Sequence, residues 1–421
     1  MRVAGVVRVP GDKSISHRSL MLAALADGRS AISGILDSAD VQSTAAVLRS
    51  LGASIPPLSA AFNVEGRGVR SFRAPTSDLD CGNSGTTTRL MAGIAAACPF
   101  TSRFVGDASL SRRPMQRVAR PLTAMGARFE FEDHDGLPML LHGASLVPIS
   151  WTTEASSAQI KSAILLAGVA AGVAVEVREP SRSRDHTERM LQAQGAGIRI
   201  DGSSVRLTPP ESGRLAPLVI AVPSDPSSAA FLAALAAMAD DGSLELPDVC
   251  LNPTRTGFFS ALERMGARVA IEAGKTEGGE DVGTVVVHSS ALSGIDLPID
   301  AVPSMIDELP LLACVAARAE GTTRVRGAAE LRLKESDRIS TVVSNLRAIG
   351  VDAEEAPDGF TVTGSDQPLR GRVRTLGDHR IAMAFGVLGA IPGNAVEIDD
   401  PSCVSVSYPA FWDDLRRAVV A

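Results

Sequence analysis

A six-residue motif, Leu-x-x-apolar-Gly-Ala, recurs along this chain and constrains its fold more than any other feature. Three copies follow the pattern and two are variants: 48–53, 122–127, 262–267, 191–196 and 346–351. Successive motif glycines lie roughly 70 to 85 residues apart, which indicates a repeated supersecondary unit. Each motif predicts a helix that ends at a C-terminal glycine, followed by a strand such as 128–131 or 197–200. A sixth, degenerate copy of the motif is expected at 411–419.

A second recurring feature is a polar turn that leads into an Ala-rich apolar helix. These helices are expected to begin near Ser16, Thr86, Ala158, Ser227, Asp307 and His379. Between the two helices of a unit lie strand candidates such as 102–105, 174–177 and 323–325. One unit therefore reads strand, helix, strand, helix, strand, strand.

A unit of this size cannot bury both of its helices and a sheet face, so several units must share a core. Three units per domain is the simplest closed grouping, and the Pro-rich stretch 209–226 is the best boundary between domains. We predict one domain at 12–222 and a second at 1–11 with 223–421. Three βαβ-type domains that merely share helix-ending glycines remain the alternative.

Composition excludes several classes of protein. The net charge of −7 and pI of about 5.5 argue against nucleic-acid or anionic-membrane partners. The five cysteines are odd in number and form no CxxC pair, which argues against a zinc ribbon or disulfide framework and favours the cytoplasm. The apolar stretch 163–175 is too short to span a bilayer. His17, His186 and His379 lack the i,i+4 pairing of a helical metal site, so we expect no metal.

Charged side chains gather at the helix starts. Four starts carry a cation that the helix dipole disfavours, and a bound anion would remove that conflict: Arg18, Arg89, Lys161 and Arg380. Two glycines precede Arg89, and Lys334 and Arg338 are expected on one helix face. Asp307 and Glu308 are carboxylates at a helix start. Each feature alone also fits a capped helix with solvated charges, but the set indicates a cleft for a small, multiply anionic substrate.

Seven motifs together resemble one enzyme family, that of 5-enolpyruvylshikimate-3-phosphate synthase, along the whole chain and in order. The motifs are 11–18, 82–86, 113–115, 157–159, 184–188, 333–338 and 377–380. The resemblance implies an α/β fold of two domains, each made of three βαβαββ units arranged as an inside-out α/β barrel. It also implies an active site in the cleft between the domains.

The family transfers the enolpyruvyl group of phosphoenolpyruvate to the 5-hydroxyl of shikimate 3-phosphate and releases phosphate, without a metal or organic cofactor. By resemblance, the catalytic residues are Asp307, Glu335 and Lys13. The implied contacts of shikimate 3-phosphate are Lys13, Ser14, Arg18, Ser157, Ala158, Gln159, Arg184, Asp307 and Lys334. Those of phosphoenolpyruvate are Lys13, Gly85, Arg113, Gln159, Arg338 and Arg380. We expect a cytoplasmic monomer with these two small-molecule substrates.

One position departs from the family pattern, because Val406 stands where many members have a phosphate-binding lysine. The sister enzyme that transfers enolpyruvyl to UDP-N-acetylglucosamine is the first alternative. It has a Lys-Asn pair near the N-terminus and a reactive cysteine in the loop that corresponds to 106–114, whereas this chain has Lys13-Ser14 and no cysteine there. A non-catalytic repeat scaffold that binds anionic partners is the alternative from another class.

Overall fold

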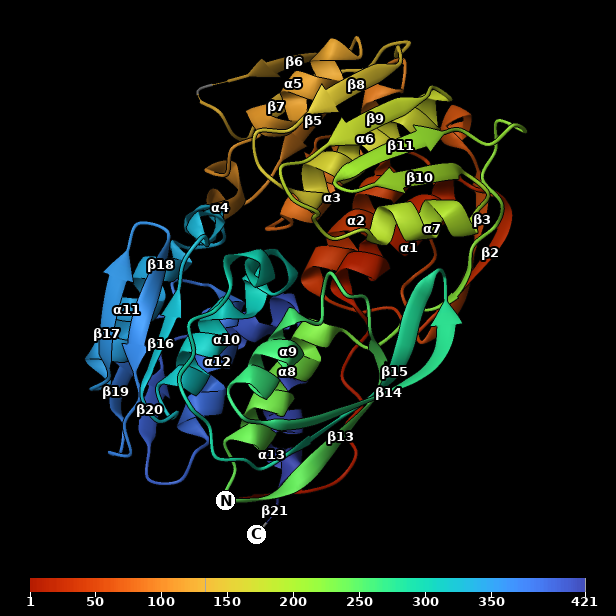
Figure 1. Ribbon diagram of the computed structural model, residues 1–421. Coiled ribbons are helices and arrows are strands. Elements are labelled where there is room, and N and C mark those ends of the chain that lie inside the picture. Colours follow the sequence, from red (N-terminus) through yellow and green to blue (C-terminus); the bar gives the residue numbers. More distant parts are fainter. Residues whose placement is uncertain (133, 421) are drawn as a thin grey trace. The chain divides into compact units, whose positions relative to one another are not determined.

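The computed structural model describes residues 1–132 and 134–420. The chain divides into two compact units (Figure 1): unit 1 is Met1–Pro10, Pro223–Lys275 and Asp281–Ala421, and unit 2 is Gly11–Val222 with Thr276–Glu280. Gly11 and Thr276–Glu280 thus group with unit 2, whereas the sequence ranges placed both in the other domain. The cause at Thr276–Glu280 is local, since Gly279 accepts a hydrogen bond from Arg189 Nη1 at 3.2 Å.

Two sheets of unit 2 share one topology. Their strand orders are β4-β5-β7-β6 and β8-β9-β11-β10, and in each the first pair is parallel and the other pairs are antiparallel. The strands are β4 (Leu79–Asp80), β5 (Thr101–Val105), β6 (Arg128–Phe131), β7 (Met139–His142), β8 (Ile149–Thr152), β9 (Val175–Arg178), β10 (Gly197–Asp201) and β11 (Ser204–Thr208). The helices between them are α3 (Gly85–Ala96), α4 (Ala108–Ser111), α5 (Gln116–Ala124), α6 (Ala158–Ala171) and α7 (His186–Ala193). Each sheet with its helices is therefore one βαβαββ repeat.

The third sheet of unit 2 is completed by a strand from far along the chain. Its consecutive elements are α1 (Lys13–Leu25), β2 (Asp27–Ser33), α2 (Ala39–Ser50) and β3 (Ala61–Arg67). The strand that should precede α1 is supplied by β12 (Val219–Ala221), which pairs in parallel with β2 from Val219 opposite Ala31. The repeat is closed although its parts are not contiguous in sequence.

Unit 1 follows the same plan. Its largest sheet has the order β14-β15-β13-β1-β21, in which β1 is parallel to β13 and antiparallel to β21. The strands of the unit are β1 (Arg2–Val3), β13 (Asp241–Cys250), β14 (Arg268–Glu277), β15 (Glu280–His288), β16 (Thr322–Val325), β17 (Asp352–Ala356), β18 (Gly359–Thr363), β19 (Arg370–Val373), β20 (Ala395–Ile398) and β21 (Val419–Val420). The helices are α8 (Pro226–Ala237), α9 (Gly257–Arg264), α10 (Leu309–Ala316), α11 (Arg338–Ala348), α12 (His379–Gly389) and α13 (Phe411–Ala418).

The first helix of each repeat lies inside its unit and the sheets lie outside. Every residue of α8 and of α10 is buried. The outer strands β6 and β10, in contrast, expose side chains to solvent. Small residues let the inner helices approach: a Cβ at Gly93 of α3 would lie 2.2 Å from the carbonyl oxygen of Ala163 in α6. Inner helices covered by outer sheets form the expected inside-out α/β architecture.

The helix ends follow the sequence motif. The motif glycines Gly52, Gly126, Gly195, Gly266 and Gly350 have φ of +89°, +119°, +90°, +98° and +94°. Glycine adopts this left-handed region without steric cost, so the predicted helix stops are confirmed. The predicted start near Asp307 lies in the 3-10 turn η3 (Ile306–Glu308), and α10 begins directly after it at Leu309. Within the described ranges, no helix combines the length and apolar character needed to cross a membrane.

Candidate functional site

The first turns of α1, α3 and α6 converge within unit 2. Arg89 of α3 donates from Nη1 to Gln159 Oε1 of α6 at 2.7 Å. Arg18 of α1 donates from Nη2 to Ser162 Oγ of α6 at 2.8 Å. The predicted site residues at or beside these turns are Lys13, Ser14, Arg18, Gly85, Ser157, Ala158 and Gln159. Two others, Arg113 and Arg184, lie on the loops before α5 and α7.

Lys13 is the first residue of α1 and is oriented by a carboxylate that the sequence analysis missed. Its Nζ lies 3.1 Å from Asp40 Oδ2 on α2, and the Asp40 side chain is 9% exposed. Asp12 caps the same helix by accepting the N–H of Ile15 at 2.8 Å. Asp40 resembles an ordinary acidic residue in a first helical turn, so no sequence signal marks it as a partner of Lys13.

Arg18 is a buried cation whose hydrogen bonds go to neutral oxygens. Its Nε, Nη1 and Nη2 donate to Thr187 Oγ1 at 2.7 Å, to the carbonyl of Ser14 at 2.9 Å and to Ser162 Oγ at 2.8 Å. Burial lowers the pKa of Arg18 to about 10, although Glu188 opposes that shift. The guanidinium still carries its charge at neutral pH and can attract an anion.

Two guanidinium groups flank Gly85 at the start of α3. A Cβ on Gly85 would lie 2.7 Å from Arg89 Nη1 and 3.4 Å from Arg113 Nη1. Arg113 also donates from Nη2 to Asn83 Oδ1 at 2.7 Å. The helix N-terminus, two cations and a residue without a side chain form a geometry that suits a small anion.

The structure corrects the expectation for Lys161. The sequence suggested that a bound anion relieves the conflict between Lys161 and the helix dipole. Instead its Nζ lies 2.8 Å from Glu179 Oε2 and 2.9 Å from Glu188 Oε1, with all three side chains 1% exposed. Burial would lower the pKa of Lys161, but Glu188 and Glu179 outweigh burial and raise it.

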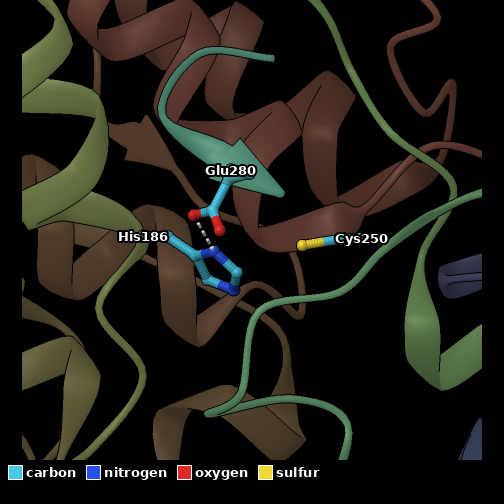
Figure 2. Close-up of side chains that lie close together, drawn as sticks. All are labelled: His186, Cys250 and Glu280. Atoms are coloured by element: carbon cyan, nitrogen blue, oxygen red, sulfur yellow. Dashed lines mark hydrogen bonds and ion pairs between the residues drawn. The ribbon is translucent and has the colours of Figure 1, made fainter. Parts of the chain in front are cut away.

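Two histidines of unit 2 take part in buried hydrogen bonds. His17 Nδ1 lies 2.6 Å from Thr44 Oγ1, which lies 2.7 Å from Thr87 Oγ1, so this chain joins α1, α2 and α3. Burial, then Lys13 and Arg18, hold the pKa of His17 well below its usual value. Figure 2 shows the other pair, in which His186 Nδ1 lies 2.7 Å from Glu280 Oε1.

The candidate residues of unit 1 gather around Arg338, whose side chain is 2% exposed. Its Nε lies 2.8 Å from Asp378 Oδ2, its Nη1 lies 3.1 Å from Asp307 Oδ1, and its Nη2 lies 2.6 Å from Glu335 Oε2. Burial would lower the pKa of Arg338, but the carboxylates of Asp378, Glu335 and Asp307 outweigh it and raise it. One arginine thus orients both predicted catalytic carboxylates of this unit.

Lys334 approaches the same carboxylate by another route. Its Nζ lies 3.0 Å from Asp307 Oδ1. The expectation that Lys334 and Arg338 share a helix face is wrong, because Lys334 follows the 3-10 turn η4 (Ala329–Leu333) whereas Arg338 is the first residue of α11. Their common partner is the Asp307 oxygen, and no shared helix is required.

Arg380 belongs to a neighbouring buried cluster at the first turns of α8 and α12. Its Nη1 lies 3.3 Å from Glu308 Oε1, to which Ser227 Oγ also donates. Arg255 Nη2 donates to Ser227 Oγ at 2.8 Å and to Asp225 Oδ1 at 3.0 Å. Glu308 and Asp378 looked like simple caps in the sequence, and Arg255 stands in none of the motifs, so these partners were not predicted.

Comparisons with known proteins agree over the full length of the chain. A family model described as EPSP synthase (3-phosphoshikimate 1-carboxyvinyltransferase) matches residues 1–415. The 3-phosphoshikimate 1-carboxyvinyltransferase of Halorhodospira halophila is 48% identical over 98% of this chain and 93% of its own length. The enzyme of the same name from Sulfurihydrogenibium sp. is 44% identical over 99% of this chain and 97% of its own length.

Solved structures support the same assignment. EPSP synthase from Acinetobacter baumannii superposes with a TM-score of 0.86 at 39% identity, covering 99% of this chain and 96% of that one. The enolpyruvyl transferase NikO from Streptomyces tendae has a TM-score of 0.76 at 18% identity over 99% and 95% of the two chains, which shows a shared fold. From the full-length family match and these relatives, the chain belongs to the EPSP synthase family.

Proposed function

We propose that this chain transfers the enolpyruvyl group of phosphoenolpyruvate to the 5-hydroxyl of shikimate 3-phosphate and releases inorganic phosphate. The observation that carries the proposal is that charged groups gather at helix starts in each unit: Arg18 beside neutral oxygens in unit 2, and Arg338 with Lys334 and three carboxylates in unit 1. Two phosphorylated substrates need several fixed cations, and membership of the EPSP synthase family supplies the reaction class.

The two substrates divide these residues between them. Ser157 and Arg184 are proposed to hold the phosphate of shikimate 3-phosphate, with the remaining contacts from Lys13, Ser14, Arg18, Ala158, Gln159, Asp307 and Lys334. The anionic groups of phosphoenolpyruvate are assigned to Lys13, Gly85, Arg113, Gln159, Arg338 and Arg380. Since these residues belong to both units, the substrates would be bound by groups from each. Arg338 and Arg380 would take over the role of the family lysine that Val406 replaces.

The proposed chemistry is addition followed by elimination. In the addition, the methylene carbon of phosphoenolpyruvate gains a proton and the 5-hydroxyl loses one as the new carbon–oxygen bond forms. In the elimination, a methyl proton is removed and phosphate leaves with the electron pair of its carbon–oxygen bond. Asp307, Glu335 and Lys13 are the proposed proton carriers. Arg338 Nη1 and Lys334 Nζ lie 3.1 and 3.0 Å from Asp307 Oδ1 and hold this carboxylate in a fixed position, which a proton carrier requires.

A phosphate-release assay tests the substrate pair directly. We expect turnover with phosphoenolpyruvate plus shikimate 3-phosphate and none with phosphoenolpyruvate plus UDP-N-acetylglucosamine. Turnover with the nucleotide sugar would assign the chain to the sister activity. No phosphate release with either acceptor would favour a non-catalytic anion-binding scaffold.

Replacing Asp307 tests the proposed proton transfer. Asp307→Ala should retain binding of shikimate 3-phosphate but lose ~10²–10⁴-fold in kcat, the usual contribution of a positioned acid or base. The matched control is Asp296→Ala, because Asp296 is 73% exposed and pairs with Arg324 at 3.4 Å. Near-normal turnover of the Asp307 variant would remove Asp307 from the mechanism.

The proposal includes a monomer in the cytoplasm. The compartment is supported by the absence of a disulfide among the five cysteines, all of which lie in the described ranges, since this suits a reducing environment. Light scattering coupled to size-exclusion chromatography should give a mass near 43.7 kDa. A stable dimer would contradict the monomer assignment alone.

A further inference from the structure

A buried carboxylate outside the proposed substrate contacts connects two of them. Glu179 follows β9 directly and its side chain is 1% exposed. Its Oε1 accepts the backbone N–H of Ser157 at 2.8 Å, and both of its oxygens accept the Ser183 hydroxyl, at 2.8 and 2.7 Å. Ser157 is the N-cap residue of α6, and Ser183 directly precedes Arg184. Glu179 thus binds the chain at one proposed phosphate contact and beside the other.

The strand order explains why these two segments meet. β8 and β9 are adjacent parallel strands, so the loops that follow them leave the sheet at the same edge. Ser156 and Ser181 add further bonds between the loops, since the Ser181 N–H donates to Ser156 Oγ at 2.9 Å and Ser156 Oγ donates to the Ser181 carbonyl at 2.7 Å. Glu179 contributes the charged member of this contact, and hydrogen bonds to a charged group are stronger than neutral ones.

Lys161 makes a carboxylate tolerable beside a phosphate site. Its ammonium binds Glu179 at 2.8 Å and the Ser183 carbonyl at 3.3 Å. A buried carboxylate without a partner would be costly and would repel an anionic ligand. Paired with Lys161, which also binds Glu188, it can orient donors toward the ligand with part of its charge compensated.

We propose that Glu179 is a positioning residue that sets the affinity for the phosphate group of shikimate 3-phosphate, by fixing Ser157 and the Ser183–Arg184 segment relative to each other. The inference rests on the proposed function. We expect phosphoenolpyruvate binding to be spared. Gln159, a proposed phosphoenolpyruvate contact on the same helix, is held by bonds that do not involve Glu179, to Arg89 at 2.7 Å and to Thr86 at 3.1 Å. Loss of Glu179 should therefore separate the two substrates kinetically.

The chain offers a matched control in Glu188. Glu188 contacts the same lysine at 2.9 Å and is equally buried, but it lies on α7, and the bonds to Ser157 and Ser183 are accepted by Glu179. Glu188→Gln changes the charge around Lys161 and leaves the bonds to Ser157 and Ser183 in place.

The experiment measures KM for each substrate and the Kd of shikimate 3-phosphate by calorimetry without phosphoenolpyruvate. For Glu179→Ala we expect KM and Kd for shikimate 3-phosphate to rise about 10-fold or more. Metal affinity falls by a similar factor when a metal-binding side chain loses the hydrogen bond that orients it. KM for phosphoenolpyruvate should change less than threefold, and Glu179→Gln, which keeps an acceptor oxygen, should recover part of the loss. Glu188→Gln should stay within threefold of the wild type for both substrates.

Ser183→Ala provides a second route if Glu179→Ala does not fold, since it removes only the hydroxyl that bonds Glu179. It should raise Kd for shikimate 3-phosphate in the same direction by a smaller factor. A folded Glu179→Ala or Ser183→Ala protein with unchanged Kd, or with equal losses for both substrates, would overturn the inference. A wild-type protein that neither binds nor turns over shikimate 3-phosphate would overturn the proposed function itself.

Discussion

The buried arginines of the two units have different kinds of partner. In unit 2, Arg18 is surrounded by neutral oxygen acceptors, and burial lowers its pKa to about 10. In unit 1, Arg338 contacts three carboxylates, which together outweigh burial and raise its pKa. A cation held by neutral groups keeps its attraction for an added anion, whereas a cation held by carboxylates also orients those carboxylates. The first arrangement suits substrate binding, and the second places the proposed proton carriers beside a proposed phosphoenolpyruvate contact.

His17 should make the stability of unit 2 depend on pH. Its pKa is lowered in the folded protein, so below pH ~6.5 the unfolded chain takes up a proton that the folded chain does not. Stability is therefore complete above that pH and falls below it, by up to about 1.4 kcal/mol per pH unit, until the folded pKa is reached. His17→Asn should flatten the loss between pH 7.5 and 5.5.

Urea denaturation in a Trp412→Phe background would measure this effect in unit 2, because Trp151 on β8 is then the remaining tryptophan. Both proteins need the same background and buffers. Equal pH slopes for the histidine and asparagine proteins would show that His17 is not responsible.

By resemblance to the family, glyphosate is expected to bind against Gly85 in place of phosphoenolpyruvate, and it is slightly longer, so Gly85 should control discrimination between the two. A methyl group there would lie 2.7 Å from Arg89 Nη1, so that guanidinium must shift, and 3.4 Å from Arg113 Nη1. We expect the wild type to be inhibited competitively with phosphoenolpyruvate, and Gly85→Ala to raise Ki for glyphosate much more than KM for phosphoenolpyruvate. Steady-state inhibition kinetics of both proteins test this prediction, and a wild type that glyphosate does not inhibit would contradict it.

The sequence identifies the cations of the candidate site better than their partners. Arg18, Arg338 and Arg380 stand in recognisable motifs. Of their partners, Ser162 and Glu308 stand outside the motifs and look like ordinary polar or capping residues, and Asp378 stands in a motif that gives no sign of its pairing with Arg338. A motif records local spacing, whereas a pairing between helices depends on how the helices pack.

At the scale of elements, glycine serves two distinct purposes that mutation can separate. Gly195 follows α7 with φ of +90° and open space around its Cβ position, so an alanine there suffers backbone strain alone. Gly93 lies inside α3, where an added Cβ would meet the Ala163 carbonyl oxygen at 2.2 Å. We expect Gly195→Ala to cost about 1 kcal/mol, and Gly93→Ala to cost more because α3 and α6 must separate.

Thermal unfolding of the two variants, with calorimetry to follow unit 2, gives the comparison. The larger fall in Tm is expected for Gly93→Ala. If Gly195→Ala proves the more harmful, close helix packing is not what requires Gly93.

Most of the repeat architecture could be read from the sequence, because its signals are local. Helix-ending glycines and short apolar strands mark the repeats wherever they occur, and the observed φ values at Gly52 and Gly350 confirm that reading. The sequence analysis assigned residues 1–11 to the domain of 223–421, but the strand pairings themselves could not be predicted. The pairing of β12 with β2, or of β1 with β13, joins segments far apart in sequence, and two or three residues carry no signal of their distant partner.

At the scale of the whole molecule, the proposed substrate contacts are divided between the units, so binding should draw the units together. We expect small-angle X-ray scattering to show a smaller radius of gyration with shikimate 3-phosphate plus a phosphoenolpyruvate analogue than without ligand. UDP-N-acetylglucosamine serves as the control ligand and should cause no compaction. An unchanged radius with the cognate pair would contradict closure.

The distant strand β12 also has a consequence for synthesis on the ribosome. β2 leaves the ribosome long before Val219–Ala221, and at ~5–20 residues per second it waits on the order of ten seconds or more for its parallel partner. During that time one edge of β2 has no neighbour and could pair with another nascent chain. Asp27 and Arg29 place charges on this strand, which discourages such pairing. Chaperone capture of nascent chains should therefore peak before residue 219 is made and decline afterwards.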